Sequence, residues 1–388
     1  MSSVKIFLVA GEESGDQLGA KLMAALRRRL PDKIAFSGVG GHAMAAEGLV
    51  SLFPLTDIAV MGFSAVIGRL PTLIRRIDQT AAAVLADNPD MLVIIDSPDF
   101  THRVAKRVRR ARPDLPIVDY VSPTVWAWRP GRARTMRAYV DHLLALLPFE
   151  PAAHLRLGGP TCSYVGHPLI ERLGELRPAP GERSEPGSGE ATVLVLPGSR
   201  RSEVTRLMPV FGETVARVTQ LSGVPLRWIL PAVPHVASLI EEAVTRWPVR
   251  PEIVTGEAAK YAAFRKATAA LAASGTVTLE LALAAIPMVV AYKVSRLEVQ
   301  ARHFITVKSA SLPNIILDEP AVPEFLQWDC VPERLASALL PLIGDTPERR
   351  AQVAAFDRVA DAMSIGMEKP SERAADIIAQ LLATKKGP

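Results

Sequence analysis

The stretch VKIFLVAGEESGDQLGAKLMAALRRR, residues 4–29, joins an apolar run to a helical pattern through a short loop. The first six residues are apolar apart from one lysine, and residues 16–29 have the spacing of an amphipathic helix. In an α/β protein, a loop of this kind usually holds phosphates through glycines and a lysine at the start of the helix. Here the loop carries Glu12, Glu13 and Asp16, and three carboxylates would repel a phosphate. The loop is therefore expected to face a different chemical group.

The same alternation of strand and helix runs through the first half of the chain and then begins again. Short apolar runs such as MLVIID, residues 91–96, alternate with amphipathic segments, which predicts a parallel sheet with helices on both faces. The stretch RPAPGERSEPGSGEA, residues 177–191, is rich in proline, glycine, serine and charge and is the predicted linker. After it the pattern restarts with TVLVLPGSRR, residues 192–201.

These patterns predict an α/β protein of two Rossmann-like domains that face each other across a cleft, followed by a helical C-terminus. The predicted N-terminal domain covers residues 1–176 and the C-terminal domain residues 192–350. Helices follow in residues 351–388, with packing back on the N-terminal domain as one option. Two such halves bring the loops at the carboxyl ends of their strands to a common cleft, which suggests an enzyme with two substrates.

The composition is that of a globular protein in a reducing compartment. Of the 388 residues, 49% are hydrophobic and 22% charged, which is ample for buried cores. Cys162 and Cys330 cannot form a disulfide framework, and neither lies in a cluster typical of zinc sites. No signal peptide is visible, and the most membrane-like stretch, residues 267–292, is interrupted by polar residues and a proline. The sequence predicts a cytoplasmic protein that is soluble or peripheral to a membrane.

Positive charge is concentrated in residues 103–139, which hold ten Lys or Arg against two Asp. Trp126 and Trp128 lie among these arginines. Basic and aromatic side chains together suit an anionic lipid surface or a nucleic acid. Because no helix-turn-helix, RRM or zinc-finger pattern is present, we predict no nucleic-acid partner.

The segment LPGSRRSEV, residues 196–204, is the candidate phosphate site. A strand is expected to end at Leu196, and a tight turn through Ser199 leads to a helix that opens with Arg200. Backbone N–H groups, the helix dipole and a guanidinium would then converge on a diphosphate. The alternative is an ordinary capped helix start with solvated arginines.

A second segment, ASGTVTLE, residues 273–280, is the candidate binding site for the ribose of a nucleotide. Ser274, Gly275 and Thr276 stand at a predicted helix start. Glu280 follows one turn later, where a carboxylate suits the paired hydroxyls of a ribose, although it could also be an ordinary surface glutamate. Pyrophosphate and ribose sites together indicate a nucleotide.

The candidate general base is Asp96, in VIIDSPDF, residues 93–100. It lies where a buried strand emerges, so that it could accept a proton from an attacking hydroxyl. Asp99 fits better as a helix N-cap. His42 and His167 are alternative bases, although histidines beside glycines are more often turn or packing residues.

The sequence lacks the motifs that are typical of other enzyme classes. GVGGHA, residues 38–43, matches a dinucleotide-binding fingerprint but follows the second strand rather than the first. The chain has no D-x-D metal pattern, P-loop lysine or G-x-S-x-G elbow. We therefore predict a sugar-nucleotide transferase that needs neither a metal nor a resident cofactor. A non-catalytic lipid- or nucleic-acid-binding module is the competing class.

In order and spacing, a series of segments resembles the lipid-A-disaccharide synthase family from about residue 4 to 385. The segments are AGEESGD, GVGGHAMAAEG, DSPDF, YVSPTVWAWRPGR, LPFEP, YVGHP, LPGSRRSEV, ASGTVTLE, PMVVAYKV, VKSASLPNIIL and VPEFLQ. The resemblance implies a GT-B glycosyltransferase of lipid A biosynthesis. It would join UDP-2,3-diacylglucosamine to 2,3-diacylglucosamine 1-phosphate (lipid X), giving a β(1→6) disaccharide and UDP. The alternative to this activity is that of another UDP-sugar transferase or an epimerase with the same fold.

The resemblance also implies roles for individual residues. Asp96 matches the family's essential base and Arg200 its essential arginine. Glu12, Ser14 and Asn314 match further functional positions. The remaining positions expected to contact substrate are Asp16 in the acidic loop and Ser199, Ser274, Gly275, Thr276, Glu280, Glu324 and Gln327 in the second half.

One departure concerns a glutamate that the family often has within MGxxEV. This chain reads MGFSAV and places Ala65 there. The surrounding apolar segment, with Met61, Phe63, Val66 and Ile67, suits acyl chains or a membrane surface, although a core-facing helix would look the same. The expected partner is therefore the anionic lipid on the cytoplasmic face of the inner membrane.

Overall fold

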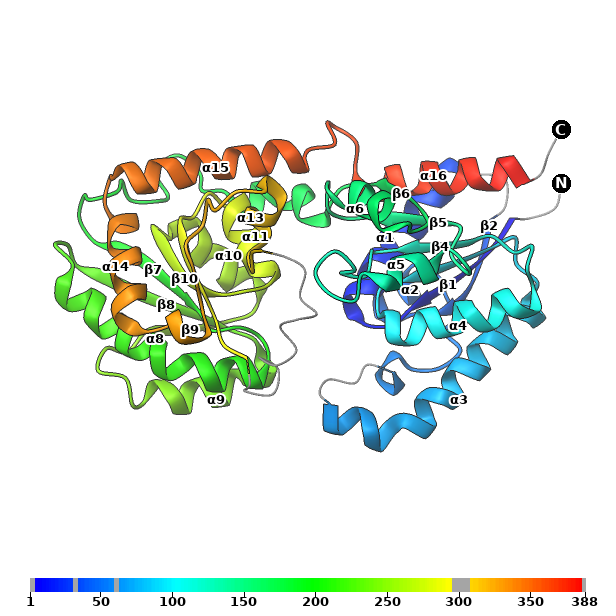
Figure 1. Ribbon diagram of the computed structural model, residues 1–388, viewed down its shortest axis with the longest axis horizontal. Helices are drawn as coiled ribbons and strands as arrows, with labels where there is room; N and C mark the ends of the chain where they lie inside the picture. Colours follow the sequence, from blue (N-terminus) through cyan, green and yellow to red (C-terminus); the bar gives the residue numbers. More distant parts are fainter. Residues whose placement is uncertain (1–3, 31–33, 59–62, 295–307, 386–388) are drawn as a thin grey trace. The chain divides into compact units, whose positions relative to one another are not determined.

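The computed structural model describes residues 4–30, 34–58, 63–294 and 308–385, and side chains between 63 and 69 are outside the described part. The chain divides into two compact units. The first comprises Met1–Pro168 and Ile365–Pro388, and the second Leu169–Ser364 (Figure 1).

The first unit contains a six-stranded sheet, in the order β2-β1-β3-β4-β5-β6, in which paired strands are all parallel. The strands are β1 (Val4–Ala10), β2 (Ile34–Val39), β3 (Met91–Ile95), β4 (Ile117–Tyr120), β5 (His142–Ala145) and β6 (Thr161–Tyr164). The helices are α1 (Glu13–Arg29), α2 (His42–Ala46), α3 (Phe63–Asp87), α4 (Pro98–Ala111), α5 (Gly131–Met136), α6 (Glu150–Leu157) and α16 (Pro370–Lys385), with a 3-10 turn at Leu55–Asp57.

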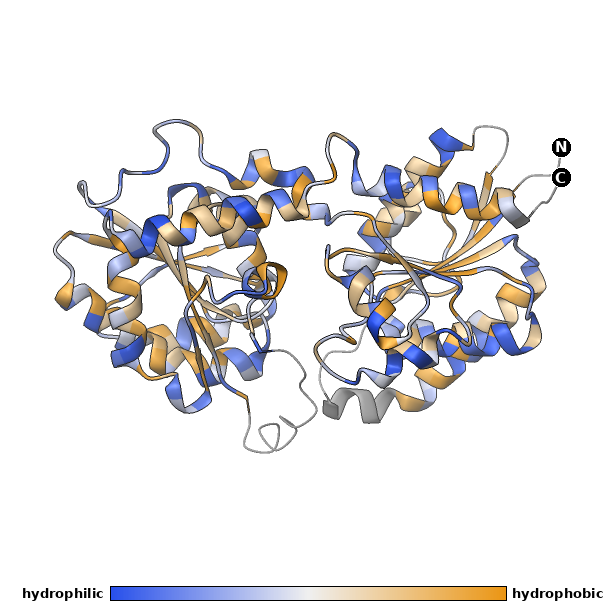
Figure 2. Ribbon diagram, turned by 45° about the horizontal axis from the view of Figure 1, so that its top comes forward, coloured by the Kyte–Doolittle hydropathy of each residue, from blue (hydrophilic) through white to orange (hydrophobic). Residues whose placement is uncertain are grey.

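Alternating side chains of this sheet build two cores. Ile6 and Leu8 pack with α1 and α16, whereas Phe7 and Val9 pack with α3 and α4. Figure 2 shows the apolar strands in orange and the hydrophilic residues on the outer faces of the helices. Helices on both faces of a parallel sheet confirm the predicted α/β class for this half.

The second unit repeats the architecture, with a parallel sheet in the order β12-β11-β10-β7-β8-β9. The strands are β7 (Ala191–Leu196), β8 (Leu226–Ala232), β9 (Glu252–Thr255), β10 (Ala269–Ala273), β11 (Met288–Tyr292) and β12 (Glu324–Leu326). The helices are α7 (Leu173–Leu176), α8 (Arg201–Leu221), α9 (Pro234–Val244), α10 (Glu257–Lys266), α11 (Thr276–Leu283), α13 (Leu312–Leu317), α14 (Pro332–Ile343) and α15 (Pro347–Met363), with 3-10 turns at Pro168–Arg172 and Gln327–Asp329.

The predicted linker, residues 177–191, lies inside the second unit. Its Arg183 donates hydrogen bonds to the backbone carbonyls of Phe264, Ala284 and Ala285, at 3.2, 2.9 and 2.8 Å. This stretch is therefore fastened along the second unit by a part-buried guanidinium.

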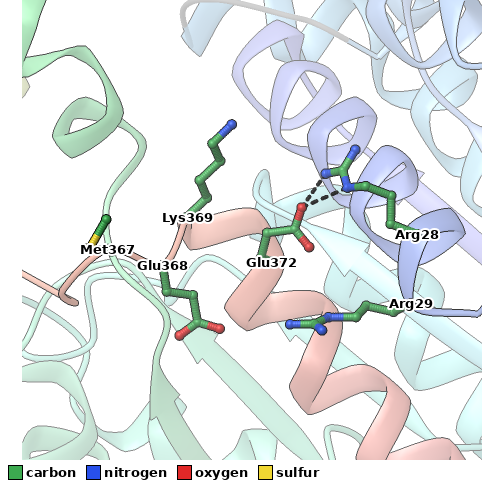
Figure 3. A pocket seen from close by; sticks show the side chains of 6 residues that line it. All are labelled: Arg28, Arg29, Met367, Glu368, Lys369 and Glu372. Atoms are coloured by element: carbon green, nitrogen blue, oxygen red, sulfur yellow. Dashed lines mark hydrogen bonds and ion pairs between the residues drawn. The ribbon is translucent and has the colours of Figure 1, made fainter.

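The two last helices belong to different units. α15 lies in the second unit beside α11 and α13, whereas α16 lies against α1 in the first. Figure 3 shows Arg28 of α1 directed at Glu372 of α16, with which it forms an ion pair. One turn along α16, Arg29 Nη2 donates to Asp376 Oδ2 at 2.7 Å. The C-terminal helix thus completes one face of the first unit.

Candidate active site

The acidic loop after β1 lies against the end of β3, and two glycines make this approach possible. A Cβ at Gly11 would stand 2.1 Å from the Cβ of Ser97, and one at Gly15 would stand 3.1 Å from the carbonyl oxygen of Ile95. A larger residue at Gly11 would push the loop away from β3. The loop can therefore hold its side chains beside the residues that follow β3.

Ser14 brings Glu12 and Asp96 together. Its Oγ lies 3.0 Å from Glu12 Oε1 and 3.2 Å from Asp96 Oδ2. A hydroxyl has one proton to donate, so it can satisfy only one of the two carboxylates at a time. Three residues expected to act on substrate thus form one acidic cluster at the carboxyl edge of the first sheet.

Asp96 is held in an uncommon backbone conformation. Asp96 and Ser97 have φ values of 55° and 45°, in the left-handed region that costs a non-glycine residue about 1 kcal/mol or more. The backbone N–H of Ser97 donates to Asp96 Oδ1 at 2.7 Å, and the Thr101 hydroxyl donates to the Asp96 carbonyl at 2.7 Å. Such strain, kept in place by surrounding hydrogen bonds, is typical of functional positions.

Asp16, also expected to contact substrate, is bound to the start of α2. The carboxylate is only 3% exposed and accepts hydrogen bonds from the backbone N–H groups of Gly41, Ala43 and Met44, at 2.7, 2.8 and 3.0 Å. With these donors, it holds the start of α2 against α1. The Asp16 carboxylate thus ties the first loop to α2.

A buried cluster that the sequence analysis missed lies under the carboxyl edge. Asp119 of β4 is fully buried, and its Oδ2 lies 3.1 Å from His102 Nε2. His102 Nδ1 lies 3.1 Å from the Tyr139 hydroxyl. Burial raises the pKa of Asp119, the nearby His102 and Arg132 oppose this rise, and the charge of Asp96 adds to it.

A second buried carboxylate, Glu150, fastens the segment that contains Trp126. Trp126 Nε1 and the backbone N–H of Leu147 both donate to Glu150 at 3.0 Å. The side chain is 3% exposed, and burial raises its pKa from 4.5 to about 7. Beside it, His154 Nε2 lies 2.8 Å from Ser122 Oγ.

In the second unit, Arg200 stands at the start of α8, directly after the turn that follows β7. Arg200 Nη1 lies 3.0 Å from Glu203 Oε1, and the backbone N–H of Arg200 donates to Glu203 Oε2 at 3.3 Å. The Arg200 side chain remains 74% exposed. His235, at the start of α9, places Nε2 2.7 Å from the Ser199 carbonyl. The start of α8 is thus a capped helix start, as the alternative to a phosphate site predicts. It also exposes the Arg200 guanidinium to solvent, as a phosphate site requires.

The glycine in this turn has a steric reason. Gly198 has φ +100°, and a Cβ there would stand 2.5 Å from Glu203 Oε2. A side chain at this position would therefore displace the carboxylate that holds Arg200.

The start of α11 divides its predicted ligands into inward and outward groups. Ser274 Oγ donates to the Ala310 carbonyl at 2.6 Å, whereas Gly275 and Thr276 are exposed. Glu280 is mostly buried and accepts from Lys260 Nζ at 2.6 Å. Gly275 and Thr276 are thus the members of this set that are open to solvent.

Asn314 and Glu324, both expected to contact substrate, bind each other. Asn314 Nδ2 donates to Glu324 Oε1 and to the Val322 carbonyl, both at 2.9 Å, while Asn314 Oδ1 accepts from the Val322 N–H at 2.7 Å. Glu324 also accepts from the backbone N–H groups of Ala310 and Ser311, at 2.9 and 2.8 Å. Asn314 is 5% exposed, so both side chains support a loop. Their neighbour Gln327 is half-buried with φ 52°.

The comparisons with known proteins agree with this architecture. A model of the family described as lipid-A-disaccharide synthetase matches residues 6–378. The chain belongs to this family. It is 57% identical over 388 residues to a lipid-A-disaccharide synthase of Nitrobacter hamburgensis, covering 100% of this chain and 98% of that protein. It is 58% identical to one of Nitrobacter winogradskyi, with 98% and 96% covered.

Solved structures show the fold of the family member described here. A putative UDP-N-acetylglucosamine 2-epimerase from Listeria monocytogenes superposes with a TM-score of 0.62 at 14% identity, covering 100% of this chain and 98% of that one. MurG of Acinetobacter baumannii does so with a TM-score of 0.58 at 12% identity, with 97% and 99% covered. These structures confirm the predicted GT-B fold, and membership of the family confirms the predicted class of UDP-sugar glycosyltransferase.

The segment that departs from the family pattern is only partly described. Met61 lies outside the described residues, as do the side chains of Phe63, Ala65, Val66 and Ile67, although α3 begins at Phe63. Within the described ranges, no group of three or more His, Cys, Asp or Glu is placed to hold a metal. None of the described helices has the length and apolar character needed to cross a bilayer.

The raised pKa of Glu150 predicts a pH-dependent stability. Because the folded protein holds this proton more tightly than the unfolded chain does, the free energy of unfolding should fall as pH rises from about 4.5 to 7, by about 3 kcal/mol from this group alone. Glu150→Gln keeps an acceptor for Trp126 but has no proton to lose. Urea unfolding at about pH 5 and about pH 8 should show a shallower loss in the variant. Equal losses in parent and variant would exclude this role.

Proposed function

We propose that the chain transfers 2,3-diacylglucosamine from UDP to the 6-hydroxyl of 2,3-diacylglucosamine 1-phosphate, in a single displacement. The observation that carries this proposal is the cluster of Glu12, Ser14 and Asp96 in a member of this family. A carboxylate at the carboxyl edge of the sheet is suited to accept a proton from a sugar hydroxyl. It also answers why the first loop is acidic: carboxylates accept hydrogen bonds from hydroxyl and amide groups of a sugar.

In the proposed mechanism, Asp96 takes the proton of the acceptor's 6-hydroxyl. The oxygen attacks the anomeric carbon of the α-linked donor, the bond from that carbon to the diphosphate oxygen breaks, and the electron pair leaves with UDP. Attack from the opposite face inverts the configuration and gives the β(1→6) disaccharide. Ser14 keeps the Asp96 carboxylate oriented through its hydroxyl, and Glu12 can take the same hydrogen bond when Asp96 is protonated.

Arg200 is proposed to stabilise the leaving diphosphate. It has a largely exposed guanidinium at a helix start, and both the arginine and the helix dipole favour negative charge there. Gly275 and Thr276 offer a second helix start, and Glu280 is proposed to contact the ribose with the oxygen that Lys260 leaves free. Arginine and helix dipoles can neutralise the diphosphate, so the proposal includes no metal and no resident cofactor.

Release of UDP from the two purified substrates tests this function. We expect UDP and a β(1→6) disaccharide to form only when both sugars are present, identified by mass and by the anomeric coupling in NMR. An epimerase of the same fold would alter the donor without the acceptor. A non-catalytic lipid-binding module would release no UDP.

We further propose that the first unit binds the cytoplasmic face of the inner membrane. Four exposed arginines in α4, in α5 and directly after α5 have no carboxylate partner in the described ranges, namely Arg103, Arg110, Arg134 and Arg137. On α3, Leu70 and Ile74 are exposed although they are large and apolar. Basic residues beside apolar ones suit a surface of anionic lipid.

Binding to anionic vesicles should therefore fall strongly, but not completely, as salt rises. The attraction is about 1 kcal/mol for each basic residue near the surface and is screened by salt, whereas apolar insertion is not. Replacing Phe63 and Ile67 by Ser should remove the salt-resistant part in a flotation assay while leaving activity on detergent-dispersed substrate largely intact. If the parent ignores anionic vesicles at low salt, the membrane proposal fails.

A further inference from the structure

The segment of residues 121–132, here called the tryptophan loop, is tied down at three points. Ser122 is held by His154, Trp126 donates to Glu150, and Arg132 Nη2 lies 3.2 Å from Asp99 Oδ1. The bond between Ser122 and His154 is buried, the bond from Trp126 to Glu150 is part-buried, and Glu150 is a carboxylate that burial makes costly to ionise. Because these bonds already hold the tryptophan loop in one conformation, a ligand that binds there need not order it.

Between its ties the tryptophan loop presents an aromatic ring and a guanidinium. Trp128 is 44% exposed, and the Arg129 guanidinium lies over its ring, 4.0 Å from the centroid. Stacking orients the arginine while leaving its N–H edges available. Arg132, on the next turn, uses one N–H group for Asp99, whose own side chain is 89% exposed. An arginine has five such groups, so Arg132 retains donors for a ligand.

Arg132 is joined through Asp99 to the start of α4, the helix that follows the proposed base. Asp99 belongs to the first turn of α4, which begins directly after Asp96 and Ser97. Moreover, the charges of Arg132 and Asp96 both act on the same buried carboxyl group, that of Asp119. A second carboxylate, that of Glu12, is joined to Asp96 through the Ser14 hydroxyl and makes this part of its surroundings acidic. A phosphate next to the reacting hydroxyl would be repelled on the acidic side and attracted on the arginine side.

The proposed acceptor carries such a phosphate. Its C1 phosphate and its C6 hydroxyl are joined by a short chain of atoms through the ring oxygen. When the hydroxyl is placed at Asp96, the phosphate must therefore lie nearby. We propose that Arg132, together with Arg129, binds the C1 phosphate of the acceptor sugar and makes the enzyme select a phosphorylated acceptor. This inference rests on the proposed function.

The test compares two acceptors, 2,3-diacylglucosamine 1-phosphate and the same sugar without phosphate, both dispersed in detergent. The variants are Arg132→Met and Arg129→Met, which remove the charge and keep an apolar stem. Arg156→Met, at an exposed position of α6, is the matched control. The parent should prefer the phosphorylated acceptor in kcat/KM. Each loop variant should lower that preference about 10- to 100-fold, mainly through KM for the phosphorylated acceptor, and leave the KM for the donor unchanged.

Other outcomes separate this site from the proposed function and from the membrane. If the parent releases no UDP with either acceptor, the proposed function fails and the inference falls with it. If the parent is active but the preference is equal in parent and variants, the arginines do not bind this phosphate. If Arg132→Met weakens binding to phosphatidylglycerol vesicles and leaves the preference unchanged, the loop recognises a lipid headgroup, and the inference is wrong.

A further variant covers the case in which Arg132→Met does not fold. Asp99→Asn removes the partner of Arg132 and keeps the guanidinium. Its preference for the phosphorylated acceptor should equal or exceed that of the parent. A clear loss of preference in Asp99→Asn would overturn the assignment.

Discussion

Replacing Asp96 by Asn should lower kcat about 100-fold or more while UDP binding stays nearly unchanged. Asparagine keeps the shape of the side chain, and its amide oxygen can still accept from the Ser97 N–H, while its NH2 group takes the place of Oδ2 and can donate to the Ser14 hydroxyl oxygen. It cannot take a proton from the acceptor's 6-hydroxyl. The loss should therefore fall on the chemical step rather than on folding or on the donor.

The measurement is single-turnover formation of disaccharide, with UDP binding followed separately by calorimetry. Asp90→Asn is a matched control, because it makes the same change at the opposite end of β3, where Asp90 accepts from the Lys5 N–H. We expect the control to keep the parent's turnover. A turnover of Asp96→Asn within a factor of two of the parent would rule out Asp96 as the base.

The strand pattern was sufficient to place several of the proposed site residues. In a parallel sheet, the residues that follow the strands gather at one edge. For this reason Glu12 and Asp96, far apart in the sequence, were both expected at that edge, and the structure joins them through Ser14. Their side chains project from the ends of β1 and β3, positions that hydropathy alone reveals.

Hydrogen-bond partners across loops could not be predicted in this way. Asp16 looks like another acid of the first loop, but its donors come from the start of α2, which a local pattern does not bring to it. Asn314 and Glu324 likewise find each other only after the chain around α13 has folded. Each of these side chains was expected to contact a ligand, and each accepts hydrogen bonds from backbone N–H groups of another segment.

Buried charge was also hidden in the sequence. Asp119 lies within PIVDYV, which reads as an ordinary strand, and its partner His102 comes from α4 on the face of the sheet. Glu150 begins a helix, where an acid is expected in any case, and nothing local shows that it accepts from Trp126. Burial depends on which elements cover a side chain, which is a property of the whole fold.

Replacing Arg200 by Ala should weaken UDP binding and slow the chemical step together. A charge-assisted hydrogen bond to the departing diphosphate becomes stronger as that group gains charge, so kcat/KM should fall about 10²- to 10³-fold. Arg201→Ala is the matched control: it changes the next residue, which is also exposed at the start of α8. It should have a much smaller effect, because Glu203 orients Arg200.

The same assay tests whether arginine alone neutralises the leaving group. If Arg200 and the helix starts carry the charge, EDTA should leave the parent's rate unchanged, and added magnesium should not rescue Arg200→Ala. Activity that is lost in EDTA and restored by magnesium or manganese would overturn the metal-free mechanism. A rate for Arg200→Ala equal to that of Arg201→Ala would instead show that its guanidinium is merely part of a capped helix start. A selective loss in Arg200→Ala that is insensitive to the chelator therefore supports both parts of the mechanism, because a metal ion would reduce the charge that the arginine must balance.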